Sequence, residues 1–186
     1  MKTVVIYKSK TGFAKKYAEW IAEALEADLL EYSKVSDDIF LKYETIIYGG
    51  GLYVVGINGV KLILKNLDKL KDKKIIVFAS GATPNREETT IEIRDKNFTV
   101  EQQKVIRFFY LRGGFDFSKL GIVDKMLMVL LKIKLRMKSE SKRSPDEKGM
   151  LEAYNAPSDF TKRKYMDELL NYALDKSRGE LLDEKG

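Results

Sequence analysis

A short turn near the start of the chain constrains its fold more than any other feature. The turn Ser9–Phe13 follows the apolar stretch Thr3–Tyr7 and leads into an amphipathic pattern over Ala14–Leu25. A strand, a tight turn and a helix in this order place the unpaired amides and positive dipole end of the helix beside two hydroxyl side chains. Gly12 allows a positive φ and a close approach of the backbone to a ligand. The turn therefore predicts an anion site, with a phosphate as its natural occupant.

The turn alone does not decide which phosphate compound binds. It lacks the first glycine and the G-K-[ST] ending of the nucleoside triphosphate loop. It also has only one glycine of the G-x-G-x-x-G dinucleotide fingerprint. Short hydroxyl-bearing turns before helices also serve as plain N-caps, without any ligand. Both interpretations stay open for this motif by itself.

Short apolar segments alternate with helical patterns along most of the chain, and segments of this length are typical of strands buried on both faces. Strands are expected at Thr3–Tyr7, Leu29–Tyr32, Thr45–Tyr48, Lys74–Ala79 and Val105–Leu111. Helices are expected at Ala14–Leu25, at Gly59–Leu67 behind an Asn58 cap, at Arg86–Lys96, and after a Ser158 cap with a core stripe of Met166, Leu169, Leu170, Ala173 and Leu174. This order predicts an α/β fold with a doubly wound, five-stranded parallel sheet and helices on both faces.

Ligands of doubly wound sheets bind beyond the carboxyl ends of the strands, near the point where the strand order reverses. Besides the first turn, the segments Gly49–Tyr53 and Ser80–Pro84 are expected to leave strand ends there. The glycines would admit a ligand to the backbone, and Leu52 or Tyr53 would cover a flat ring. Each segment could be an ordinary turn, but the three together predict a mononucleotide flavin, FMN. The predicted FMN-binding residues are Ser9, Lys10, Thr11, Gly12, Phe13, Ala14, Gly50, Gly51, Leu52, Tyr53, Ser80, Gly81, Ala82 and Thr83.

Composition narrows the chemistry further. The 186 residues include neither cysteine nor histidine, which excludes thiolate nucleophiles, Ser-His-Asp triads and nearly every zinc site. We therefore expect no metal site and a cofactor that carries any reaction, and no catalytic acid or base can be named. We expect one domain over residues 1–176, with an insertion at about 113–148 and a polar tail at 177–186. Met1 and Lys2 run directly into a strand, so a cytoplasmic location is the default expectation.

These motifs resemble those of the flavodoxin-domain family, and more closely its branch of menaquinone-dependent protoporphyrinogen IX dehydrogenases. The residues that carry the resemblance are Ser9–Gly12, Tyr48–Tyr53, Gly56–Gly59, Ser80-Gly81 and Phe108–Gly114. The resemblance implies a flavodoxin-like fold, with Ser9–Ala14 around the FMN phosphate and the other two segments beside the flavin ring. Family members usually carry a threonine where this chain has Ala14, so backbone amides must supply more of the phosphate contacts. The branch implies a tetrapyrrole substrate and a quinone acceptor.

The segment Ser118–Arg143 concentrates the basic charge of the chain. It has eight basic and two acidic residues, a net charge of +6 that equals the charge of the whole chain. On a helix over Ile122–Met137, one apolar stripe suffices for packing against a core. That stripe consists of Ile122, Met126, Val129, Leu130, Ile133 and Met137. A second apolar set remains on the other side, formed by Leu127, Met128, Leu131 and Leu135.

Two interpretations of this helix stay open. It could pack between two protein surfaces, for example in a homodimer. It could instead lie on the inner face of a membrane as a peripheral contact, with basic residues facing lipid phosphates. The basic residues expected at such a contact are Lys125, Lys132, Lys134, Arg136 and Lys138. Sixteen residues at ~1.5 Å each make only ~24 Å, which is short for a span.

The sequence leads to one main functional hypothesis, an FMN-dependent oxidoreductase that passes electrons from a reduced substrate to a quinone. The alternative is a soluble flavodoxin-type electron carrier. A remote alternative is a non-enzymatic binding module that uses the basic helix. Nucleic-acid binding is not expected, because the basic residues share their helix with large apolar side chains rather than with stacking aromatics.

Overall fold

A parallel sheet forms the centre of the molecule in the computed structural model, which describes residues 2–53, 56–154 and 157–175. Its strands follow the order β2-β1-β3-β5-β6 and all run parallel. The short strand β4 pairs antiparallel with the end of β3. The strands are β1 (Thr3–Lys8), β2 (Asp28–Glu31), β3 (Thr45–Tyr53), β4 (Gly56–Ile57), β5 (Lys74–Gly81) and β6 (Ile106–Arg112). The order reverses at β1, which places the switch point between β1 and β3.

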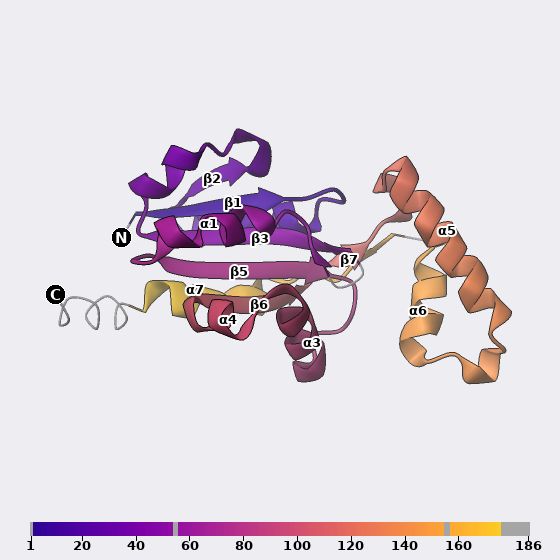
Figure 1. Cartoon of the computed structure of the whole chain (residues 1–186). Helices are drawn as coiled ribbons and strands as arrows, with labels where there is room; N and C mark the ends of the chain where they lie inside the picture. The colour runs from indigo at the N-terminus through magenta and orange to yellow at the C-terminus, as the bar shows by residue number, and fades with distance from the viewer. Residues whose placement is uncertain (1, 54–55, 155–156, 176–186) are drawn as a thin grey trace.

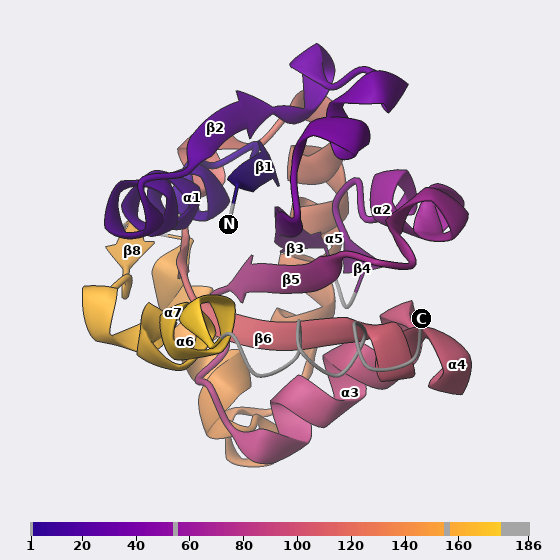
Figure 2. The ribbon, with the colours of Figure 1, turned by 90° about the vertical axis from the view of Figure 1, so that its left-hand side faces the viewer.

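Helices cover both faces of this sheet, as Figure 2 shows from one end. Side chains alternate between the two faces along each strand, so that Val5 and Phe78 lie in one buried cluster, and Val4 and Val77 lie in the other. The first cluster packs against α1 (Phe13–Leu25) and α7 (Asp167–Leu174). The second packs against α2 (Lys61–Lys65), α3 (Glu87–Asn97) and the 3-10 turns Asp37–Lys42 and Leu67–Leu70. The doubly wound α/β fold is therefore confirmed.

A helical hairpin projects from the carboxyl end of the sheet (Figure 1). It consists of α5 (Ile122–Met137) and α6 (Pro145–Ala153). At its base, β7 (Gly114–Phe115) pairs antiparallel with β8 (Ser158–Asp159). The chain thus leaves the body after β7 and returns through β8. The division into a domain of residues 1–176 and an insertion at about 113–148 stays a prediction, and the expected tail at 177–186 lies outside the described residues.

Two predicted strands are longer than expected, and the difference changes the account of the site. β3 continues through the three glycines to Tyr53, because Gly49 and Gly50 pair with β1 and β5 on either side. β5 likewise continues through Ser80 to Gly81. These residues were expected in loops, but the neighbouring strands satisfy their backbone groups. The other expected strands lie within one residue of the observed ones.

Several helix predictions are corrected. Ser158 does not cap a helix, because it pairs with Phe115 in β8, and α7 begins only at Asp167. Asn58 does not cap α2, whose N-cap is Val60 without a side-chain bond. α4 (Val100–Val105) was not predicted. It begins with a capping box between Thr99 and Gln102 and includes Val105, so that β6 starts one residue later than expected.

The structure shows which apolar face of α5 the chain leaves uncovered. The stripe that would suffice for packing on a core is exposed, with Ile122 85% and Met137 84% accessible. Leu135, from the second apolar set, is buried at 5%. The hydroxyl of Tyr154, just after α6, donates to the carbonyl of Met128. Leu127, at the edge of the second set, stays exposed at 60%. None of the helices within the described residues has the length and hydropathy needed to cross a bilayer.

Candidate functional site

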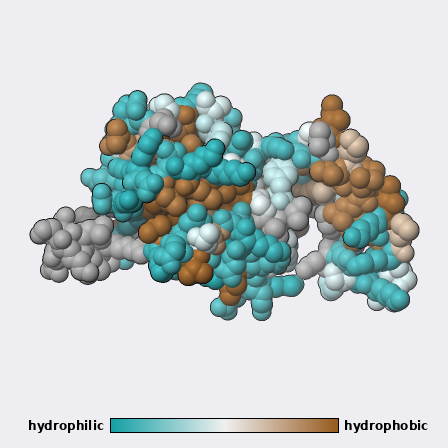
Figure 3. All heavy atoms as spheres, viewed as in Figure 1, coloured by the Kyte–Doolittle hydropathy of each residue, from teal (hydrophilic) through white to brown (hydrophobic). Residues whose placement is uncertain are grey.

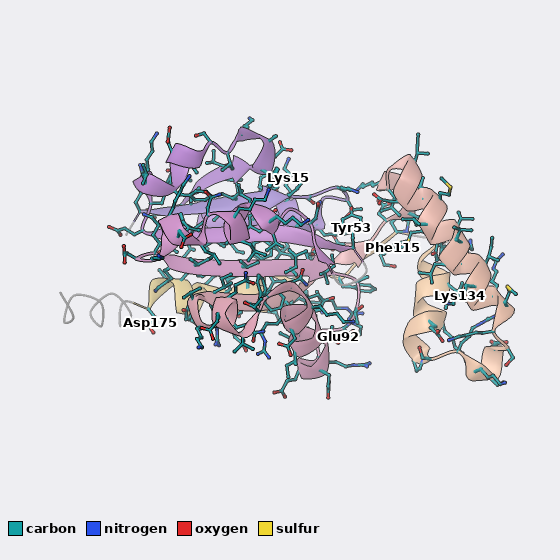
Figure 4. All side chains as sticks on the ribbon, in the orientation of Figure 1. Lys15, Tyr53, Glu92, Phe115, Lys134 and Asp175 are labelled. Carbon is teal, nitrogen blue, oxygen red and sulfur yellow. The ribbon has the colours of Figure 1, made fainter. Side chains whose placement is uncertain are left out.

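A cavity of about 690 Å³ lies at the carboxyl ends of β1, β3 and β5. Such volumes are typical of sites for small organic ligands. The body supplies its floor, and α5 supplies Leu127, Met128 and Leu131 as an apolar roof. Figure 4 places Tyr53 and Phe115 at the end of the sheet that faces α5. The cavity therefore occupies the position where doubly wound sheets hold their ligands.

The turn between β1 and α1 has the geometry expected of an anion site. Gly12 forms the N-cap of α1 with a φ of 95°, a left-handed conformation that a side chain would strain. The backbone amide of Gly12 donates to the Ser9 hydroxyl oxygen at 3.0 Å. That hydroxyl keeps its own proton for donation, and the first-turn amides of α1 lack intrahelical acceptors. Among the described residues, a Cβ on Gly12 would meet nothing within 4 Å.

Only one of the three consecutive glycines of β3 leaves room for a ligand. A Cβ on Gly49 would lie 2.0 Å from the Phe78 ring, and one on Gly50 would lie 2.7 Å from the Asn58 carbonyl oxygen. These two glycines are thus required by packing within the chain. A Cβ on Gly51 would meet its nearest neighbour, Tyr53, only at 4.0 Å. Gly51 lines the cavity, so it is the position where a ligand could approach the β3 backbone.

Two buried polar side chains at the cavity lack a hydrogen-bond partner among the described residues. They are the Ser80 hydroxyl and the Asn58 amide nitrogen. Both residues line the cavity. A buried polar group without a partner costs about 1–3 kcal/mol, so native proteins rarely retain one without reason. Donors in this position fit a ligand that offers oxygen or ring-nitrogen acceptors.

Three segments of the chain meet at Lys10. Its ammonium group donates to the Asp124 carboxylate of α5 at 2.6 Å and lies 4.3 Å from the centre of the Tyr53 ring. Burial raises the pKa of Tyr53 to about 12, and the negative charge of Asp124 adds to this rise. The Tyr53 hydroxyl is therefore neutral at physiological pH and remains a hydrogen-bond donor. This cluster joins the turn before α1, the end of β3 and the projecting hairpin.

Most of the predicted FMN-binding residues surround this cavity. Those that line it are Lys10, Thr11, Phe13, Ala14, Gly51, Leu52, Tyr53, Ser80, Gly81, Ala82 and Thr83. Ser9, Gly12 and Gly50 do not line it, although Ser9 and Gly12 shape the turn beside it. The contacts of all these residues with a cofactor stay predictions.

Sequence reasoning missed several residues that line the cavity. They are Gly56, Ile57, Asn58, Gly114, Phe115, Leu120, Asp124, Leu127, Met128 and Leu131. The sequence contains a hint for three α5 residues. Leu127, Met128 and Leu131 belong to the second apolar set, which a helix packed on one side only would not need. Asp124 and Phe115 carried no such signal, since their place at the site depends on the path of the chain beyond β6, which no local pattern specifies.

A comparison with known families agrees with this geometry. A family model described as a flavodoxin domain matches residues 4–143. The chain belongs to the flavodoxin-domain family. The match includes all the predicted cofactor segments and α5, and membership of this family suggests a redox function. The dehydrogenase branch is a finer assignment that the match does not make.

Single related proteins say less about this chain than the family model does. An uncharacterised protein of Methanocaldococcus jannaschii is 37% identical over 87 residues, which span 45% of this chain and 57% of that protein. The matched part is thus little more than half the length of this relative. Solved structures include a flavodoxin from the domain Archaea, with 20% identity, a TM-score of 0.38, and coverage of 68% of this chain and 90% of that one. Megasphaera elsdenii flavodoxin has 19% identity, a TM-score of 0.42, and coverage of 57% of this chain and 84% of that one. These similarities carry no argument about substrate or partners.

FMN is the cofactor of this flavodoxin-domain chain, and the cavity residues fit it. The unpartnered donors of Ser80 and Asn58, the open approach at Gly51 and the apolar roof suit a flat heterocycle with polar edges. The turn at Gly12 suits its phosphate. When bound, FMN supplies one- and two-electron redox chemistry. The protein supplies the position, the apolar wall and the surrounding charge.

Proposed function

We propose that this protein is an FMN-dependent oxidoreductase that takes electrons from a reduced organic substrate and passes them to a quinone. The resemblance to menaquinone-dependent protoporphyrinogen IX dehydrogenases makes a protoporphyrinogen-like tetrapyrrole the first substrate to test. Each two-electron step would remove two hydrogen atoms from the substrate. The quinone would take up two electrons and two protons as it becomes a quinol.

The roof that α5 forms over the cavity is the observation that carries this proposal. Leu127, Met128 and Leu131 line the cavity on the side away from the sheet. An electron carrier that serves protein partners needs a flavin edge that those partners can approach. A cavity beside a flavin with an apolar wall on the other side instead favours a small, apolar reactant, because burial of its surface contributes to binding.

Residues of the cavity would orient such a reactant and control its protons. Lys10 and Asp124 are the charged residues that line the cavity within the described part of the chain. Their ion pair, at 2.6 Å, would hold α5 against the cofactor turn and keep its apolar side chains beside the site. Tyr53, neutral at physiological pH, would donate a hydrogen bond to an acceptor in the cavity.

Anaerobic half-reactions of the FMN-loaded protein test this proposal. Protoporphyrinogen IX should bleach the visible flavin absorbance, and a menaquinone analogue should restore it. Both half-reactions should be at least as fast as steady-state turnover with the two reactants together. Leu131→Glu in the roof should slow both half-reactions, whereas Leu41→Glu on the exposed 3-10 turn of the body should not. The proposal fails if neither reactant changes the absorbance while a flavodoxin reductase reduces the flavin quickly, because that behaviour defines an electron carrier.

A further inference from the structure

The outward face of α5 is an exposed apolar stripe. Its members are 43% to 85% accessible, and Figure 3 shows them as a brown band on the projecting hairpin. The stripe consists of Ile122, Met126, Val129, Leu130, Ile133 and Met137, with Leu127 at its edge. Contiguous apolar patches of this kind mark surfaces that bind a partner or a membrane.

The hairpin does not use this stripe for its own stability. The opposite side of α5 holds Leu135, which is buried, and the carbonyl of Met128, which accepts the Tyr154 hydroxyl at 2.7 Å. The Arg143 guanidinium donates to the carbonyls of Leu135 and Arg136 and so closes the end of the helix. The stripe is thus free to bury its surface against something outside the chain.

Basic side chains border the stripe on both sides. At 3.6 residues per turn, Lys125 and Arg136 fall along one border and Lys134 along the other. Within the described residues these three side chains form no ion pair. Other basic residues of the segment are engaged, since Lys138 pairs with Glu147 and Lys132 lies 4.8 Å from the centre of the Tyr154 ring. The expected five-residue basic contact therefore reduces to Lys125, Lys134 and Arg136.

We infer that α5 docks on the surface of an anionic bilayer, with its axis in the membrane plane and its apolar stripe among the acyl chains. An apolar band between two basic borders is the pattern of an interfacial helix. The borders would then meet lipid phosphates, which attract Lys and Arg side chains. A second copy of the chain fits the surface less well. A two-fold contact brings the same patch against itself, so the uncompensated cations of both copies would gather at one interface.

The position of α5 gives this docking a consequence for the cavity. Leu127, Met128 and Leu131 face the cavity from the same helix whose other side would lie in the lipid. Docking would thus bring the apolar wall of the cavity to the membrane surface, where a lipid-soluble reactant could reach it. The docking itself does not depend on which reactant the protein uses.

Vesicle cosedimentation tests the inference directly. The full chain should pellet with vesicles of equal parts phosphatidylcholine and phosphatidylglycerol at low salt, and less so with phosphatidylcholine alone or as salt rises. Leu130→Glu should weaken binding at least about tenfold, because burial of one leucine side chain is worth more than that factor. Lys134→Gln should weaken it roughly fivefold. Leu41→Glu and Lys42→Gln, on an exposed turn of the body, are matched controls and should bind like the parent chain.

A second measurement uses the lack of cysteine in the chain. Met126→Cys carries a unique label, and an environment-sensitive fluorophore there should shift to the blue on anionic vesicles, whereas the same label at Leu41→Cys should not. Two results would overturn the inference. One is no binding of the parent chain to anionic vesicles at low salt. The other is a dimer that Leu130→Glu converts to a monomer while vesicle binding stays unchanged, because the stripe would then be buried between copies.

Discussion

Deletion of the Ser80 hydroxyl should affect the stability of the cofactor-free protein and the affinity for FMN in opposite directions. This hydroxyl is buried, lines the cavity and has no hydrogen-bond partner among the described residues. A group of this kind costs the cofactor-free protein about 1–3 kcal/mol. Ser80→Ala should therefore leave the melting temperature of that form unchanged or raise it, by about 2–4 °C for each kcal/mol recovered.

The FMN-loaded form should respond in the opposite direction. If Ser80 donates to the cofactor, its loss removes a hydrogen bond worth about 0.5–1.5 kcal/mol, and the dissociation constant for FMN should rise about two- to tenfold. Thr45→Val is the matched control, because Thr45 also has a buried, unpartnered hydroxyl but lies at the amino end of β3. Thr45→Val should leave unchanged or raise the melting temperature without FMN, and it should leave the dissociation constant for FMN unchanged.

Thermal melts without FMN and fluorescence titrations with FMN measure the two effects separately. A marked loss of stability in Ser80→Ala without FMN would show that the hydroxyl already has a partner in the protein. An equal loss of FMN affinity in both variants would show that Ser80 has no special place at the cofactor. Either result would refute the reasoning.

Two further predictions concern the strand glycines and the hairpin. Gly49→Ala should lower the free energy of unfolding in urea by about 1–3 kcal/mol or more, because its Cβ would lie 2.0 Å from the Phe78 ring. Gly51→Ala, with no neighbour closer than 4.0 Å, should change it by less than about 0.5 kcal/mol, and equal losses would contradict this assignment. The Lys138 ammonium and the Ser144 amide lower the pKa of Glu147 below its ordinary 4.5. This depressed pKa stabilises the α5–α6 hairpin above pH 4.5, and the contribution is lost as the pH falls through the lowered value. The protection factors of the α6 amides, which correct for the intrinsic pH dependence of exchange, should fall over that range, and they should not in Glu147→Gln.

The sequence predicts the fold well where local pattern and global fold agree. Thr3–Lys8, the turn at Gly12 and α1 follow from one apolar run, one glycine and one amphipathic period. The strand ends are harder, because Gly49 and Gly50 resemble a loop until β1 and β5 pair with them on both sides. Similarly, Ser158 has the chemistry of a helix cap, and only its pairing with Phe115 places it in a strand.

The orientation of α5 shows a different limit. Its sequence contains two apolar faces, and the helical period alone does not say which of them the chain covers. The tertiary structure decides, since Leu135 is buried and Met126 stays exposed at 59%. The same orientation of α5 places its cavity-lining side chains and Asp124 at the site. Residues brought together by a long return of the chain are therefore the part of the site that local patterns could not predict.

A comparison of FMN with riboflavin tests the central claim most directly, because the two ligands differ only in the phosphate. The account holds that the turn at Gly12 binds that phosphate through backbone amides and hydroxyls. Two charge-assisted hydrogen bonds of about 1.5–3 kcal/mol each predict that FMN binds at least about a hundredfold more tightly than riboflavin in a calorimetric titration. Equal affinity for the two ligands, or no binding of FMN, would contradict the account.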